Sequence, residues 1–443
     1  MEFKKITVGN FAENLDRFRI PLSSAEREKK RGKYPYYGAA KIIDYVDGFT
    51  HSGLSVLIAE DGSVETDKGY PVVQLANGEY WVNNHTHVLK GKNDWDTLYL
   101  YYALQIIKVS PFVTGAVQKK ISQKALNSME LNYFEDPMIR RKIVESLLGL
   151  DKKIELNTQI NQTLEQIAQT IFKSWFIDFD PVHAKANALA NGQTLEQATQ
   201  AAMSVISGKN TQELHRLQTA NPEQYQQLWE IAEAFPSGVD EEGVPRGWEQ
   251  TTLSEVCSMK NGYAFKSSDW TEEGIPVIKI GSVKPMIVEV DGNGFVDEEH
   301  SVLHSEFLLT EGDIVVGLTG YVGEVGRIPQ GRTAMLNQRV AKFIPNKLNE
   351  QQDYYSFVYC LVRDKSFKAF AETNAKGSAQ ANISTKELLN YSIILASPEI
   401  QMKFESLIKP LLDKILVNSG NNEYLSKVRD LLLPNLLSGE IHL

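Results

Sequence analysis

The chain has 443 residues, 42% of them hydrophobic and 23% charged, which is typical of a globular protein with two or three domains. Its net charge of −10 argues against a strong nucleic-acid binder that acts alone, although residues 1–137 carry 17 basic and 17 acidic side chains and are neutral. No stretch has the roughly 20 apolar residues of a membrane span, no signal peptide is apparent, and Cys257 and Cys360 form no disulfide framework, so we expect a cytoplasmic protein.

Residues 1–136 are predicted to form a mixed, strand-rich module. Short β-branched and aromatic runs such as "LSVLIAEDG" and "YWVNNHTHVL" are separated by Gly, Asn and Asp. Within this module, "EREKKRGKYPYYG" places basic residues beside tyrosines, a combination suited to a phosphate backbone and the adjacent groove. A solvated loop with packed tyrosines explains the same pattern equally well. The candidate DNA contacts here are Lys29, Lys30, Arg31, Lys33, Tyr34, Tyr36 and Lys41.

His85 and His87 lie two apart in a predicted strand and would share one face of it. Two imidazoles on one face can hold a metal, but no Cys or carboxylate stands nearby at ligand spacing. We therefore expect a structural role and predict no metal site.

Residues 137–178 are predicted to form a long helix, which begins after a proline and has apolar positions alternately three and four apart. Asn157 and Asn161 interrupt this apolar stripe. They mark either an exposed stretch of the helix or buried asparagines that fix its register against a partner helix.

Residues 179–246 form an acidic linker rich in Ala and Gln, predicted to be a helical spacer packed on the long helices. Asp178 and Asp180, in "DFDP", are interpreted as a solvated helix end rather than part of a catalytic site.

Residues 247–397 are predicted to form a second strand-rich module. The glycines of "GLTGYVGEVG" indicate turns, because no Lys-Ser or Lys-Thr follows them as a phosphate loop requires. Asn337-Gln338-Arg339 echoes Asn83-Asn84-His85 of the first module, and we expect both to lie in a strand at similar depth in their modules. The candidate DNA contacts of this module are Lys260, Tyr263, Lys266, Lys279, Lys284, Arg327, Gln338 and Arg339.

A second long helix is predicted over residues 398–438, and it repeats the first. "TGAVQKKISQKAL" at Thr114 matches "KGSAQANISTKEL" at Lys376, and Asn418 and Asn422 stand where Asn157 and Asn161 do. The obvious partner of each helix is its own repeat. We favour an antiparallel coiled coil with pseudo-two-fold symmetry, and Gly420 suggests a local break in the second helix. The fold class is thus α+β, with two modules alternating with two long helices.

No catalytic motif is apparent in the sequence. A nucleophile elbow is absent, and so are the glycine-rich cofactor loop and the Pro-Pro-aromatic motif of a base methyltransferase. We predict no catalytic residues.

The combined pattern resembles the specificity subunit of type I restriction-modification systems. The residues that carry the likeness are "GKYPYYGAAKIIDY", "GLSVLIAEDGS", the run "GDIVVGLTGYVGEVG" with "MLNQRVAKFIP", the two helix junctions and "TLEQIAQTIFKSWFIDFDPV". The resemblance implies two target-recognition modules that each read half of a split site in double-stranded DNA, with helices that set the gap. It also implies two methylation subunits and restriction subunits as partners, with S-adenosylmethionine and ATP bound by those partners and no cofactor here.

Two other readings stay open from the residues alone. One is a DNA methyltransferase with a fused target domain, which the missing cofactor motifs disfavour. The other is a coiled-coil scaffold with two protein-binding modules, which the basic-aromatic stretches disfavour modestly.

Overall fold

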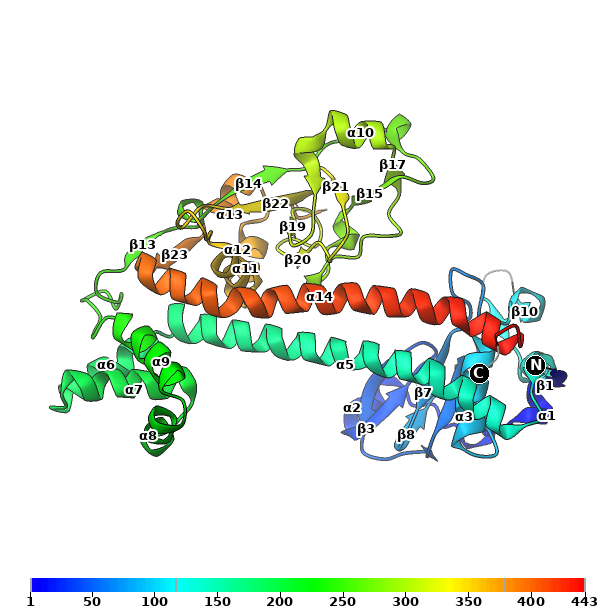
Figure 1. The fold of residues 1–443 in the computed structure, drawn as a ribbon. Coiled ribbons are helices and arrows are strands. Elements are labelled where there is room, and N and C mark those ends of the chain that lie inside the picture. The colour runs from blue at the N-terminus through cyan, green and yellow to red at the C-terminus, as the bar shows by residue number, and fades with distance from the viewer. Residues whose placement is uncertain (1, 116–117, 378–379, 442–443) are drawn as a thin grey trace. The chain divides into compact units, whose positions relative to one another are not determined.

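The computed structural model describes residues 2–115, 118–377 and 380–441 (Figure 1). The chain divides into two compact units, Met1–Glu155 with Glu423–Leu443, and Leu156–Asn422. None of the helices in the described ranges combines the length and apolarity of a membrane span.

The two longest helices, α5 (Pro137–Phe176) and α14 (Pro398–Leu437), each run for 40 residues, about 60 Å. Each contributes one part to each unit. In the second unit they run antiparallel, because Asn157 donates to Asn422 (2.9 Å) while Asn418 donates to Asn161 (2.9 Å). Asn157 thus pairs with the repeat of Asn161, and Asn161 pairs with the repeat of Asn157. This contact therefore has local two-fold symmetry. The predicted antiparallel pairing is confirmed.

Three of the four asparagines are buried, which decides between the two interpretations of the sequence. Asn157, Asn161 and Asn418 are each at most 5% exposed, and the Asn161 amide also donates to the Ile415 carbonyl oxygen (3.3 Å). A shift of one helix along the other would leave these polar groups buried without partners, so the pairs specify register.

The predicted helix break at Gly420 is wrong, because α14 is continuous through it. A Cβ atom at this position would lie 3.0 Å from the side chain of Gln330. The glycine therefore permits close approach of a loop from the second module, rather than ending the helix.

The first unit contains two four-stranded sheets and two two-stranded ribbons, with sheet orders β2-β9-β6-β7 and β4-β3-β8-β5. Ribbon β1-β12 joins the start of the module to its end. The strands are β1 (Lys4–Thr7), β2 (Glu13–Asn14), β3 (Arg31–Tyr37), β4 (Ile42–Val46), β5 (His51–Ser52), β6 (Ser55–Ala59), β7 (Val73–Ala76), β8 (Glu79–Val82), β9 (Thr86–Lys90), β10 (Val113–Thr114), β11 (Lys120–Ile121) and β12 (Glu130–Tyr133). The helices are α1 (Val8–Phe11), α2 (Ser24–Lys29), α3 (Asp94–Leu104) and α4 (Gln123–Ser128).

The second unit repeats this plan, with sheet orders β14-β22-β19-β20-β16 and β17-β15-β21-β18 and a first-to-last ribbon, β13-β23. Its strands are β13 (Glu249–Thr252), β14 (Cys257–Asn261), β15 (Ile275–Ile278), β16 (Met286–Ile287), β17 (Phe295–Val296), β18 (Leu308–Leu309), β19 (Ile314–Gly317), β20 (Val325–Arg327), β21 (Ala334–Leu336), β22 (Val340–Pro345) and β23 (Ser392–Leu395). Its module helices are α10 (Glu298–Leu303), α11 (Tyr355–Arg363), α12 (Lys365–Asn374) and α13 (Thr385–Leu389).

The linker folds as four helices, as its composition predicts. They are α6 (Asp180–Ala190), α7 (Leu195–Ser207), α8 (Thr211–Ala220) and α9 (Pro222–Ala234). The buried Lys185 amine of α6 donates to three carbonyl oxygens at the end of α9, the shortest being that of Phe235 at 2.6 Å. Phe235 in turn packs edge-on against Trp175 of α5, with ring centroids 5.0 Å apart. The linker is therefore anchored to the end of α5.

Candidate nucleic-acid interface

The repeated sequence at Thr114 and Lys376 forms the same short hairpin in both modules. Thr114 pairs with Lys120 in one, and Lys376 pairs with Asn382 in the other. Gly115 and Gly377 have φ angles of +90° and +114°, and a Cβ at either would collide with the backbone three residues on. The positions between each glycine and the following glutamine lie outside the described residues.

Three loops meet at one end of the sheets in each module. In the first module, Ile121 N–H donates to the Glu60 backbone carbonyl (2.8 Å), and Glu60 N–H donates to the His85 backbone carbonyl (2.9 Å). In the second module, Ile383 N–H donates to the Leu318 backbone carbonyl (2.9 Å), and Leu318 N–H donates to the Arg339 backbone carbonyl (2.9 Å). Equivalent backbone hydrogen bonds therefore hold the corresponding loops together in both modules.

Asn83-Asn84-His85 and Asn337-Gln338-Arg339 occupy corresponding turns, not strands as predicted. The first turn joins β8 to β9, and the second joins β21 to β22. In each segment three consecutive polar residues follow three apolar ones, a break in the strand pattern that indicates a turn and that the prediction did not use.

In the first module, most candidate contacts lie where α2 ends and β3 begins. Lys29, Lys30, Arg31 and Lys33 are exposed. The Lys33 amine lies 5.1 Å from the ring of Tyr34, whose centroid is 5.4 Å from that of Phe49. The predicted association of cations with aromatic rings is present here.

Two candidates in this module differ from that group. Tyr36 is only 1% exposed, and its hydroxyl accepts a hydrogen bond from the backbone N–H of Leu22 (2.9 Å). Its candidacy as a DNA contact is therefore wrong: it is a core residue. Lys41 is exposed but lies in the turn between β3 and β4, at the opposite end of β3 from Arg31.

In the second module, the candidates near the turn at Gln338 come together. Tyr263 N–H donates to the Leu336 carbonyl, and Gln338 N–H donates to that of Tyr263, at 2.8 and 2.9 Å. β15 ends beside β21 at the same turn and leads into Lys279. Gln338 and Arg339 are exposed, as their proposed role requires.

Aromatic rings contact the partly buried lysines of this group. The Lys260 amine lies 4.6 Å from the ring of Phe307, and the Lys279 amine lies 3.9 Å from that of Trp270. Tyr263 stacks on His304 at 4.1 Å. Lys266 and Lys284 are exposed, and Lys284 lies 3.8 Å from Glu289.

Arg327 is not a surface residue, which corrects the sequence prediction. It is 0% exposed, donates to the Leu412 carbonyl of α14 (3.0 Å) and lies over the Tyr359 ring at 4.4 Å. It therefore joins the second module to its helix and cannot reach DNA.

Among the exposed aromatic residues of the first module that the sequence reasoning missed, two lie on strand β4 or just beyond it. Tyr45, 52% exposed, lies on the edge strand β4, and Phe49, 46% exposed, lies just beyond that strand. Tyr45 carries no clear sequence signal, because the strand IIDYV does not alternate apolar and polar residues. The same holds for Phe49, because its exposure depends on how the loop packs against Tyr34.

His87 belongs to a buried network that the sequence spacing could not reveal. Among the described residues, Asp16, Glu60 and His87 place possible ligand atoms within 4.8 Å of one another. His87 Nδ1 lies 2.5 Å from Asp16, however, and Glu60 already pairs with Arg19 (2.6 Å) and Lys120 (3.0 Å). Although burial favours the neutral acid, the hydrogen bond and charge of His87 lower the pKa of Asp16. These contacts support a structural role.

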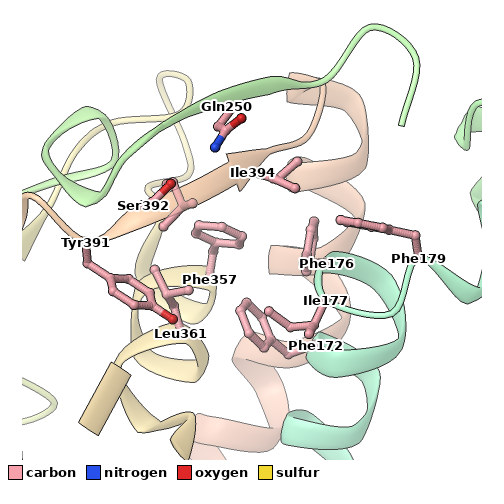
Figure 2. A pocket seen from close by; sticks show the side chains of 11 residues that line it. Phe172, Phe176, Ile177, Phe179, Gln250, Phe357, Leu361, Tyr391, Ser392 and Ile394 are labelled. Atoms are coloured by element: carbon pink, nitrogen blue, oxygen red, sulfur yellow. The ribbon is translucent and has the colours of Figure 1, made fainter. Parts of the chain in front are cut away.

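An apolar cavity of about 280 Å³ lies where α5 ends in the second unit (Figure 2). Phe172 and Phe176 of α5, Phe357 of α11 and the ribbon β13-β23 enclose it. A counterpart of about 230 Å³ in the first unit lies between β1-β12 and Leu437, the residue of α14 that corresponds to Phe176. No acid, imidazole or thiol is among the residues that line the first cavity. We interpret both cavities as packing gaps where a module meets the end of a long helix, α5 in the second unit and α14 in the first.

The fold and these surfaces define a class: a protein with two related recognition modules, each joined in the same way to a long helix of an antiparallel pair. Residues 1–166 and 245–426 match the family described as type I restriction modification DNA specificity domain. The chain belongs to this family, and the resemblance seen in the sequence is confirmed.

Named relatives agree. The chain is 37% identical over 333 residues to the type I restriction enzyme HindI specificity subunit of Haemophilus influenzae, covering 73% of this chain and 71% of the relative. It is 26% identical over 353 residues to the MjaIX specificity subunit of Methanocaldococcus jannaschii, covering 77% and 68%. The crystal structure of the S subunit from M. genitalium has the same fold, with a TM-score of 0.54, 17% identity and coverage of 98% and 96%.

Proposed function

We propose that this chain directs a type I restriction-modification complex to a split, asymmetric DNA site, with each module reading one half. The observation that carries the proposal is the repetition of structure. In each module the hairpin is followed by a short helix capped by a serine (α4 by Ser122, α13 by Ser384), the last strand of the ribbon and a long helix, while the exposed residues of the two modules differ. A common frame with different surfaces suits two half-sites of different sequence.

The helix pair would set the distance between the half-sites. Helices α5 and α14 each supply residues to both units, so in this proposal their length would fix the separation of the modules. Since major-groove faces recur about every 34 Å, a rigid spacer converts helix length into base-pair spacing. The buried asparagine pairs support this role, because they oppose sliding of one helix along the other.

The proposal includes partners and the absence of catalysis in this chain. Methylation and cleavage would belong to two methylation subunits and to restriction subunits, which would bind S-adenosylmethionine and ATP. These partners would also supply cations to the DNA clamp, which explains how an acidic chain can serve in it, and the complex would act in the cytoplasm. Saturable binding of S-adenosylmethionine to this chain alone, measured by calorimetry, would contradict this assignment and favour a methyltransferase.

The spacing is tested by removing one heptad from each helix at facing positions. This shortens the pair by about 10 Å, roughly three base pairs, with little rotation. Methylation profiling of a genome that carries the complete system should show the same half-site bases with a shorter gap. Exchange of residues 247–397 for another module is the matched control and should change one half-site while the gap stays constant. Changed bases with an unchanged gap in the shortened variant would refute the spacer role.

A further inference from the structure

The two modules differ strongly in charge in one corresponding segment. In the first module this segment is residues 15–54, between β2 and β6, which both pair with β9. In the second module it is residues 262–313, between β14 and β19, which both pair with β22. Residues 15–54 contain eight Lys and Arg against five Asp and Glu, a net charge of +3. Residues 262–313 contain three against eleven, a net charge of −8.

The positive segment of the first module presents its cations and aromatic rings together. We name the set formed by Lys29, Lys30, Arg31, Lys33, Tyr34, Tyr45 and Phe49 the basic-aromatic edge. A backbone hydrogen bond from Asp47 N–H to the Lys30 carbonyl (2.7 Å) ties the end of α2 to the residue after β4, and the pairing of β3 with β4 has an irregularity between Arg31 and Tyr34.

The cations of this edge remain available to a ligand. The carboxylates closest to them make long, exposed ion pairs, 3.7 Å from Lys30 to Asp47 and 3.8 Å from Arg31 to Glu28. Exposed pairs of this kind contribute little free energy, so a phosphate can displace them. The rings of Tyr34 and Phe49 add apolar surface beside Lys33, and Tyr45 is exposed on the neighbouring strand β4, a combination typical of nucleic-acid contacts.

The corresponding surface of the second module has the opposite character. Helix α10 carries Glu298 and Glu299 in its first turn, with Val302 and Leu303 exposed at its end. Carboxylates within a Debye length of about 8 Å would repel a DNA backbone. Lys266 and Lys284 are exposed within this acidic segment, and the exposed candidates outside it include the base-reading types Gln338 and Arg339, in the turn between β21 and β22.

We propose that the two modules hold DNA by different means: the basic-aromatic edge binds the phosphate backbone, whereas the second module makes few phosphate contacts and engages its half-site mainly through Gln338 and Arg339. This inference rests on the proposed function. If the proposal holds, most of the salt-dependent affinity that this chain contributes comes from the contact between the first module and its half-site.

The test compares two matched pairs of exposed lysines in the complete complex with its methylation subunits. The variants are Lys29→Gln/Lys33→Gln in the first module and Lys266→Gln/Lys284→Gln in the second, which remove the same charge. Binding to a duplex that carries the target found by methylation profiling is measured by fluorescence anisotropy, from about 50 mM to 200 mM salt. Each lost phosphate contact lowers the slope of log K against log salt by about 0.9.

We expect the first pair to lower the slope by roughly 2 and the second by less than about 0.5. Lys29→Arg/Lys33→Arg keeps the charge and should preserve the slope, which separates phosphate binding from a structural effect. Lys30→Gln alone should lower the slope by about 1. Equal losses from the two lysine pairs, or a larger loss from the second, would overturn the inference while the preference for the target persists. A wild-type complex with no preference for the target would instead overturn the proposed function.

Discussion

Glu405 offers a test of how the second module is fixed to α14. Its carboxylate is buried, 2% exposed, and accepts hydrogen bonds from the backbone N–H groups of Ser356 and Phe357, both at 2.9 Å. These N–H groups belong to the first turn of α11, where no intrahelical acceptor exists. Glu405 therefore caps α11 from another helix.

Burial raises the pKa of Glu405 from 4.5 to about 7, against the effect of these hydrogen bonds. Between these two values the folded protein holds a proton that the unfolded chain has released. Stability must therefore rise as the pH falls through 7, and this gain is complete below about 4.5. The linkage relation gives a gain of roughly 1.3 kcal/mol between about pH 8 and pH 6.

The assay is urea unfolding of the full chain at both pH values, for the wild type and for Glu405→Gln. The variant cannot titrate, so the difference between the two proteins isolates this group from the histidines. Glu399→Gln, an exposed acid on the same helix, is the control and should retain the wild-type pH dependence. If Glu405→Gln shows the same pH dependence as the wild type, the carboxyl does not titrate in this range and the reasoning fails.

Two further outcomes are expected. Asn418→Leu should lower the free energy of unfolding by about 1–3 kcal/mol, because it leaves the buried Asn161 carbonyl oxygen without its donor, and urea unfolding measures this. A double variant with Asn161→Leu should recover part of the loss; a further additive loss would contradict the argument. Gly149→Ala should raise the thermal midpoint, since a Cβ there meets open space in a helix, whereas Gly420→Ala should lower it because its Cβ meets Gln330 at 3.0 Å. Equal shifts for the two glycines would contradict the account of Gly420.

Some candidate contacts could be found from the sequence and others could not. Lys29 to Lys33 are consecutive or nearly so, so local sequence was enough to group them. Gln338 and Tyr263 are 75 positions apart and meet only because β14 and β21 lie beside one turn. Arg327 and Tyr36 were wrongly included, because an arginine or tyrosine in a strand can point to either face, and only packing shows which.

The sequence by itself determined the repeat, the long helices and the family, because these follow from periodic apolar positions and from similar segments at a constant offset. Only the tertiary structure decided that the asparagines are buried and paired, that α14 passes unbroken through Gly420, and that Asp16 and Glu60 surround His87. The physical reason is the same in each case. Burial and pairing depend on residues far apart in the chain, and a local pattern contains no information about which distant group will fill the space beside it.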